Sequence, residues 1–229
     1  MNKLDWKSFE PRFHKSWWNK MQPIIESEMM WNIYQELKKN GKNVLPGSGD
    51  VFKAFTMPFE KIRAIWVGMC PYHTPGMADG LCFSCANYKL SPSLSVLYSA
   101  MEDDLKEKIT KIPQLDYLKD GGILMLNSSL TTLKGIAGAH TELWKPFMKV
   151  LFEDVLDVVT GIPVIMFGKE AEYVEQFLTP NVFPLKVKHP AYYARLNQPM
   201  QHKNLFSWMN TITKKNTGRE IIWDNQLPF

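Results

Sequence analysis

The chain has 229 residues, of which 45% are hydrophobic and 22% charged, and this balance is ordinary for a globular protein. It excludes a disordered chain, a collagen-like chain and a coiled coil, and no apolar run approaches the ~18 residues that a membrane-spanning helix needs. The net charge is +4, but residues 184–229 hold seven basic and two acidic side chains. This end is therefore either a surface for a polyanion such as nucleic acid or an ordinary Lys-rich surface.

The N-terminal part of the chain is predicted to be helical. We expect helices over residues 6–39, with Pro23 near a helix start, and assign residues 1–43 to a helical N-terminal part. The first residues have no apolar core and no small-residue cleavage site, so they do not resemble a secretory signal. Three clustered cysteines are too few for a disulfide framework, which indicates a reducing, intracellular location: cytoplasm, nucleoid or nucleus.

Four short apolar runs follow, and none alternates cleanly between apolar and polar residues. Such runs are typical of strands buried on both faces of a parallel sheet. Segments with helical character lie between and after them, over residues 94–101, 147–155, 171–178 and 204–214. The alternation predicts a single α/β domain over residues 1–229, with a central four-stranded parallel β-sheet flanked by helices on both faces. The four runs are residues 62–67, 122–126, 162–167 and 182–187.

Side chains capable of proton or hydrogen-bond chemistry follow three of the four predicted strands. Tyr72 and His73 follow the first strand, Asn127 the second and His189 the fourth. Because the carboxyl ends of parallel strands meet at one edge of a sheet, where ligands bind, we expect these side chains to lie close together. A Gly- and Pro-rich loop leads to Phe83 nearby, so the sequence predicts a site for a planar ligand.

These residues fall in segments that resemble the family I uracil-DNA glycosylases along nearly the whole chain. Residues 68–73 resemble the water-activating loop GQDPYH, residues 78–84 resemble AHGLCFS, and residues 91–94 resemble the end of a Pro-rich loop. Residues 122–131 resemble GVLLLNxxLT, His140 lies where the family has its SH element, and His189 opens a loop like HPSPLS. Weaker matches lie at residues 44–55 and 222–223. The order and spacing of these segments make the resemblance specific.

The resemblance implies a DNA glycosylase that flips uracil, or a modified pyrimidine such as one of viral DNA, out of the helix and hydrolyses its N-glycosidic bond. By this resemblance Phe83 stacks on the base and Asn127 reads its polar edge. Tyr72 lies against the base C5 atom, and Met69 contacts the base in the same pocket. His189 donates a hydrogen bond to the base as negative charge develops there.

The resemblance also implies contacts with the DNA backbone. Ser93 and His73, the latter also a catalytic-loop residue, would hold phosphates near the flipped nucleotide, and Arg195 and Lys203 would add positive charge. Tyr193 falls where the family has a Leu wedge that fills the vacated place in the base stack. The expected partner is therefore DNA. We expect the protein to act as a monomer that does not bind a membrane and needs no cofactor or metal.

Each base-pocket residue has an alternative structural explanation. Phe83 is explained as core, Asn127 as a helix cap or turn residue, Tyr72 as a turn aromatic and His189 as a half-buried histidine.

A metal site is the alternative for the three thiols. Cys70, Cys82 and Cys85 would need a fourth zinc ligand such as His73. Cys82, however, belongs to the LCFS-like run, where it is expected to pack as a buried hydrophobe.

Cys70 is the main departure from the family pattern, because it stands where the resemblance places an aspartate. That aspartate orients the attacking water and stabilises the cationic sugar, whereas a thiol is mostly neutral near pH 7. Loss of such a group lowers a rate by about 10²–10⁴. Asp79 replaces a family histidine and is an alternative carboxylate, while Ala191 and Ala194 replace two phosphate-binding serines.

Three explanations of Cys70 remain open at this point. The chain is a working glycosylase whose leaving group departs without help from that carboxylate, or a glycosylase fold kept for DNA binding with little catalysis. In the third explanation the thiol is itself a nucleophile or a redox switch, which requires a lowered pKa.

Overall fold

The central element is a four-stranded parallel sheet with the strand order β3-β2-β5-β6, seen in a computed structural model that describes residues 6–87 and 89–223. Each strand overlaps one of the predicted apolar runs. The predicted α/β class with a central four-stranded parallel sheet is therefore confirmed. The strands are β2 (Ala64–Gly68), β3 (Ile123–Asn127), β5 (Pro163–Phe167) and β6 (Phe183–Val187).

Burial separates β6 from the other three strands. Every residue of β2, β3 and β5 is buried, because helices cover both faces of these strands. The expectation that β6 is also buried on both faces is wrong, because only Val187 of this strand is buried. β6 pairs with β5 alone and forms one edge of the sheet, so its outer side has no strand beside it.

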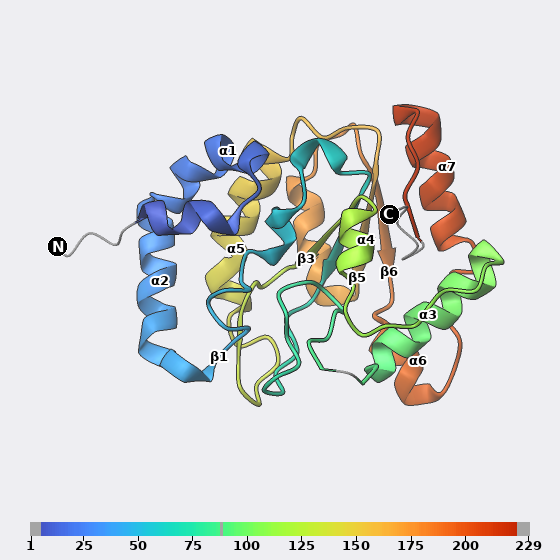
Figure 1. Cartoon of the computed structure of the whole chain (residues 1–229), viewed down its shortest axis with the longest axis horizontal. Coiled ribbons are helices and arrows are strands. Elements are labelled where there is room, and N and C mark those ends of the chain that lie inside the picture. Colours follow the sequence, from blue (N-terminus) through green and yellow to red (C-terminus); the bar gives the residue numbers. More distant parts are fainter. Residues whose placement is uncertain (1–5, 88, 224–229) are drawn as a thin grey trace.

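Helices lie on both sides of the sheet. Figure 1 shows α1, α2 and α5 on one side and α3, α6 and α7 on the other. The predicted apolar face of α3 is buried, including Leu94, Leu97, Tyr98 and Met101. The α-helices are α1 (Lys15–Ile25), α2 (Glu28–Asn40), α3 (Pro92–Leu105), α4 (Asp116–Asp120), α5 (Thr141–Val150), α6 (Pro190–Leu196) and α7 (Leu205–Thr217).

Shorter helical segments complete the chain. The predicted helix over residues 171–178 is a 3₁₀ helix, and the segment after α5 continues as a π-helical turn. The segments are η1 (Trp6–Arg12), η2 (Gly41–Asn43), η3 (Lys53–Thr56), η4 (Phe59–Lys61), η5 (Leu151–Val155) and η6 (Lys169–Phe177).

The N-terminal part is helical as predicted, but Pro23 does not mark a helix start. It lies inside α1, two residues before the end of that helix. The start of α2 is set instead by Ser27, whose hydroxyl accepts a hydrogen bond from the Met30 amide at 3.3 Å. Residues 1–5 of the predicted N-terminal part lie outside the described residues.

A small second sheet joins the N-terminal part to the segment that follows β3. β1 (Val44–Leu45) pairs antiparallel with β4 (Thr132–Leu133). Among the described residues, no helix is both long and apolar enough to cross a membrane.

Candidate active site

The carboxyl ends of β2 and β3 place Gly68 beside Asn127, since the two residues are partners in the parallel register. A Cβ atom at Gly68 would lie 2.8 Å from Asn127 Oδ1, so the glycine leaves room for this amide. Asn127 is only 4% exposed. Within the described residues its amide makes no hydrogen bond, yet it is not sealed from solvent. Its donors and acceptor are thus available to a ligand.

Phe83 lies between the buried core and the predicted site. Its ring packs edge-on against Phe167, with 4.9 Å between the centroids, and lies 5.4 Å from the ring of His189. Its φ angle of 64° falls in the left-handed region, which residues other than glycine rarely adopt. Such backbone strain is typical of functional sites, where the surrounding contacts hold it. Phe83 therefore packs against the core on the side of Phe167 and also contacts a residue of the predicted site, His189.

Tyr72 connects the loop after β2 with the start of α3. Its hydroxyl donates to the Phe83 carbonyl at 3.1 Å and lies 2.6 Å from the Ser91 hydroxyl. Because Tyr72 has one hydroxyl proton, Ser91 donates in the second contact. Ser91 also caps α3 by accepting from the Leu94 amide. Burial raises the pKa of the Tyr72 hydroxyl, which keeps it neutral.

His189 follows β6 and caps α6 with its ring. Nδ1 accepts a hydrogen bond from the Ala191 amide at 3.1 Å, so the neutral ring has its proton on Nε2. Burial, with a smaller contribution from the charge of Arg195, lowers the pKa of His189 to about 4. A Cβ at Gly168 would lie 2.9 Å from the His189 Cβ, so this glycine permits the close packing. His189 is therefore a neutral hydrogen-bond donor at neutral pH.

Cys70 and Met69 follow Gly68 directly. The half-buried Cys70 Sγ accepts from the Gly138 amide at 3.3 Å. Burial raises the pKa of this thiol, the Gly138 contact lowers it, and the charge of Glu170 raises it further, with a net increase. A raised pKa disfavours the explanation in which Cys70 is a nucleophile. Met69 is held through its carbonyl oxygen, which accepts from Ser128 Oγ at 2.8 Å.

Asp79 does not serve as a catalytic carboxylate, because its oxygens are used inside the protein. It is 6% exposed, forms an ion pair with Lys53 at 3.2 Å, and accepts from the Leu81 amide and the Ser84 hydroxyl. Lys53 also binds Asp116 at 2.9 Å. These contacts fix the loop that leads to Phe83 against η3. A Cβ at Gly80 would overlap the Asp50 carbonyl oxygen, so the packing there requires glycine.

The residue predicted as a wedge is in the wrong place for that role. Tyr193 is 1% exposed and packs inside the protein, whereas its neighbour Tyr192 is 37% exposed. Successive residues of a helix point about 100° apart, so on α6 one ring turns inward and the other outward. Lys188 Nζ lies 4.6 Å from the centroid of the Tyr192 ring. Tyr192, which the sequence analysis missed, is the exposed aromatic of this loop.

The remaining DNA-contact candidates differ in exposure. His73, Arg195 and Lys203 are exposed, whereas Ser93 is 8% exposed within the first turn of α3. Their roles in DNA binding stay predictions. His140 is buried, with Nδ1 at 2.9 Å from the Thr131 hydroxyl.

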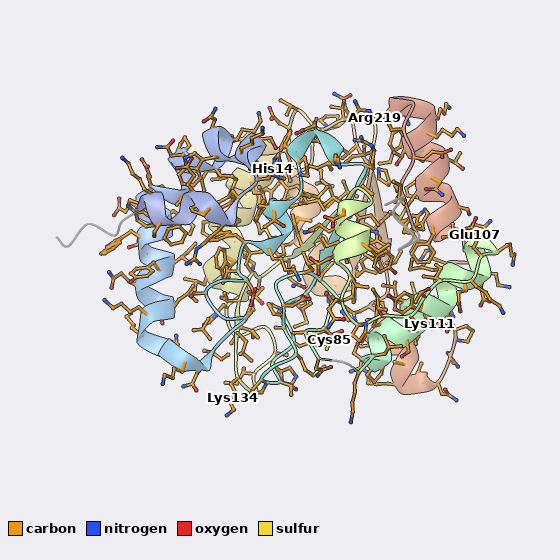
Figure 2. All side chains as sticks on the ribbon, in the orientation of Figure 1. His14, Cys85, Glu107, Lys111, Lys134 and Arg219 are labelled. Atoms are coloured by element: carbon orange, nitrogen blue, oxygen red, sulfur yellow. The ribbon has the colours of Figure 1, made fainter. Side chains whose placement is uncertain are left out.

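The basic C-terminal segment is not a single surface. Arg219 donates to the Glu60 carbonyl, and Thr213 to the Arg63 carbonyl, so both lie at the amino ends of the strands. Lys214 forms an ion pair with Glu220 in the same region. Figure 2 shows Arg219 at the edge of the molecule opposite Cys85 and Lys134. The cations Lys188, Arg195 and Lys203 of this segment lie instead between the carboxyl end of β6 and α7.

The structure gives no indication of a metal site in the part of the chain that it describes. No group of three or more His, Cys, Asp or Glu side chains there could hold a metal ion. Cys82 is completely buried beneath Gly68, and burial raises the pKa of its thiol.

Sequence comparison finds relatives that cover most of this chain, although no protein-family model matches it. A uracil-DNA glycosylase of Alkaliphilus metalliredigens is 32% identical over 221 residues, covering 92% of this chain and 95% of the relative. One of Fusobacterium nucleatum is 30% identical over 225 residues, covering 96% and 94%.

Solved structures share the fold. The crystal structure of mimivirus uracil-DNA glycosylase aligns with a TM-score of 0.84 at 20% identity, covering 97% of this chain and 90% of that one. The Nitratifractor salsuginis protein aligns with a TM-score of 0.64 at 17% identity, covering 87% and 99%. With sequence relatives of this identity and coverage, the chain belongs to the uracil-DNA glycosylase family.

Proposed function

We propose that this protein is a DNA glycosylase that flips uracil or a modified pyrimidine out of DNA and hydrolyses its N-glycosidic bond, leaving an abasic site. The observation that supports this best is the state of His189. Its ring is neutral, has its proton on Nε2 and lies 5.4 Å from Phe83. A preorganised neutral donor beside an aromatic platform suits a leaving base that gains negative charge.

Base binding is assigned to four side chains. Asn127, with its free amide, pairs with the polar edge of uracil, whose donor and acceptor pattern differs from that of cytosine. Phe83 stacks on the base. Tyr72, held through its hydroxyl by Ser91 and Phe83, lies against C5 and disfavours larger groups there. Met69 contacts the base from the same loop.

The reaction breaks the bond between the sugar C1′ and the base nitrogen. The base leaves with the electron pair and His189 Nε2–H stabilises its negative charge. The oxygen of a water molecule bonds to C1′ and keeps one proton as a hydroxyl group. The other proton of that water is transferred to the departing base. Cys70 contributes no negative charge to the cationic sugar, because its raised pKa keeps the thiol neutral.

DNA is held by side chains around this edge. His73 and Ser93 contact phosphates near the flipped nucleotide, and Arg195 and Lys203 add positive charge. Tyr192, rather than the buried Tyr193, fills the vacated place in the stack, since it is the exposed ring. We infer that residues 1–229 act as one domain and as a monomer.

The test is base release from DNA duplexes that contain uracil or one of several modified pyrimidines, scored as abasic sites. The wild type is expected to release at least one of these bases. Asn127→Ala and His189→Ala should each lower release at least tenfold while DNA affinity changes less than threefold, because their contacts form fully only after flipping. Variants that bind and cut like the wild type would show that the assigned site is wrong.

A second candidate function is DNA binding without catalysis. The neutral, half-buried thiol of Cys70 favours it, because no carboxylate of the described residues stands at that position to activate water. On this reading the wild type binds DNA but releases no base from any duplex in the panel.

A further inference from the structure

A cleft lies in the N-terminal part of the molecule, lined by residues between Trp6 and Phe52 together with Trp144. It has a volume of about 760 Å³, within the range of small-molecule sites. Its floor consists of side chains that are almost completely buried: Met30, Ile33, Val51, Phe52 and Trp144. Half-exposed aromatic rings of Trp6, Phe9 and Tyr34 line it above this floor. None of the residues assigned to base binding lines this cleft.

The charged side chains of the cleft are all of one sign. Arg12, Lys38 and Lys42 line it, and no lining residue is acidic. None of these three cations forms an ion pair within the described part of the chain, where Lys39, for comparison, pairs with Glu36. An apolar cleft with unpaired cations complements a ligand that has an apolar body and an anionic group.

Arg12 is the cation best prepared to bind such a group. Its guanidinium lies over the Phe9 ring, 5.0 Å from the centroid, and donates to the Ser48 carbonyl. These two contacts restrict the side chain and leave further N–H donors of its planar fork free. Arginine held in this way matches the two oxygens of a carboxylate or sulfonate.

We propose that this cleft binds an amphipathic monoanion, an apolar chain or ring system with one acidic head group. The apolar body lies against the floor and the aromatic rings, and the head group pairs with Arg12, with Lys38 and Lys42 adding positive potential at the rim. This site is separate from the proposed glycosylase site, so its test needs no DNA and no catalysis.

Two fluorescent probes separate the apolar contribution from the charge. 8-Anilinonaphthalene-1-sulfonate has the ring system of N-phenyl-1-naphthylamine plus one sulfonate. The protein should bind the sulfonate saturably and at least tenfold more tightly than the neutral probe, by the usual size of a charge-assisted contact. Dodecanoate should displace it. Arg12→Gln should weaken sulfonate binding about tenfold and leave the neutral probe within twofold.

Two glycines provide a matched pair of variants that tests whether the probes bind in this cleft. Gly47 lines the cleft and Gly49 does not, and a Cβ at either meets no atom within 4 Å. Gly47→Phe should therefore fill the cleft and weaken both probes at least tenfold, whereas Gly49→Phe should change neither more than twofold. If Gly47→Phe does not fold, Lys38→Glu with Lys42→Glu, on the exposed rim, should weaken the sulfonate alone.

Several outcomes would overturn the proposal. One is absence of saturable binding, and another is equal binding of both probes with no effect of Arg12→Gln. Binding that Gly47→Phe leaves unchanged would place the probe elsewhere. Concentration-dependent dimers that Gly47→Phe dissociates in sedimentation would assign the cleft to a second copy of the chain. Displacement by an acidic, aromatic peptide but not by dodecanoate would assign it to a protein partner.

Discussion

Cys70 combines three properties that bear on catalysis. It follows Gly68 at the end of β2, its sulfur accepts a single amide hydrogen bond, and burial raises its pKa. A neutral thiol neither draws a proton from water nor offsets the positive charge of an oxocarbenium-like sugar. Any catalysis therefore depends on stabilisation of the departing base, and His189 is the group assigned to that task.

Restoring a carboxylate at this position should raise activity. Cys70→Asp should increase uracil release, by up to about 10²–10⁴, the usual size of acid–base assistance. The rate of uracil excision under single-turnover conditions at pH 7.5 measures this increase. Cys70→Ser, which removes thiolate chemistry at similar size, should change release less than threefold. Loss of activity in both variants would mean that the thiol has its own catalytic role.

The protonation state of His189 predicts the acid limit of the reaction. The folded pKa of about 4 lies below the usual value near 6.5. Base release should therefore stay level through pH 6.5 and fall only as the pH approaches 4. The neutral ring stabilises the fold fully above pH 6.5, and this contribution is lost progressively as the pH falls through about 4, since the unfolded chain takes up the proton first.

Single-turnover rates and the NMR titration of the His189 ring between pH 4 and 8 measure these two effects. His189→Gln should be slower at all pH values and lack the limb near pH 4. A ring that titrates near 6.5 in the folded protein contradicts the assigned donor state.

At the scale of elements, an ion pair holds the loop that contains Phe83. Lys53 of η3 binds Asp79 and Asp116, and Asp79 also binds Ser84, next to Phe83 in sequence. These contacts fix the loop on either side of a residue with a left-handed backbone. Under the proposed function, Lys53 and Asp79 are thus positioning residues for Phe83.

Breaking this pair should affect catalysis more than binding. Asp79→Asn and Lys53→Met should each lower kcat for base release about tenfold or more, with KM changed less than threefold, since a misplaced ring lowers the fraction of productive complexes. Lys53→Arg, which keeps the charge, should recover most of the rate. Equal loss of thermal stability in Lys53→Arg and Lys53→Met, without a kcat difference, argues for a purely structural role.

The elements with the strongest sequence signal were predicted well. Continuous apolar runs identified β2, β3 and β5 because both faces of those strands are covered. The position of β6 in the sequence was predicted, but its exposure to solvent was not. The exposure follows from its place at the edge of the sheet, and the apolar run of residues 182–187 does not reveal the strand order. Pro23 was misplaced because a proline in the last turn of a helix gives the same local pattern as one before a start.

The members of the candidate site stay predictions, and the structure tests only part of their geometry. Strand exits predicted that Asn127 and His189 lie at the carboxyl ends of the strands, and they lie there at the two outer strands, with Asn127 ending β3 and His189 following β6. The structure also shows the contact between His189 and Phe83. The inward turn of Tyr193 was not predictable, because it depends on the packing of α6 against α3, which is far away in sequence. Gly68 and Gly168 had a usable signal, because Gly68 ends a buried strand and Gly168 follows one. At both positions a neighbouring side chain leaves no room for a Cβ.

At the scale of the whole molecule, the distribution of charge predicts which cations meet DNA. Lys188 and Lys203 lie after β6 and before α7, whereas Lys214 and Lys215 lie in the last turn of α7, towards the amino ends of the strands. Lys188→Gln with Lys203→Gln should flatten the log–log salt dependence of DNA binding by roughly 1.8, at about 0.9 per phosphate contact.

The control also removes two positive charges, but near the amino ends of the strands. Lys214→Gln with Lys215→Gln should leave the slope within experimental error of the wild type. Fluorescence anisotropy with a labelled duplex over a range of salt measures both variants. A wild-type slope near zero removes DNA as the partner, and equal flattening by both pairs means that net charge alone is responsible.

The hydroxyl chain from Ser91 through Tyr72 to the Phe83 carbonyl has a consequence for the timing of base recognition. It links three segments separated by 11 and 19 residues in sequence, so none can move without breaking a hydrogen bond that the others share. The entropy of ordering these loops is therefore lost during folding, before DNA arrives. Under the proposed function, an arriving nucleotide therefore meets a Tyr72 side chain that is already in place, and a free base without its strand meets the same surface.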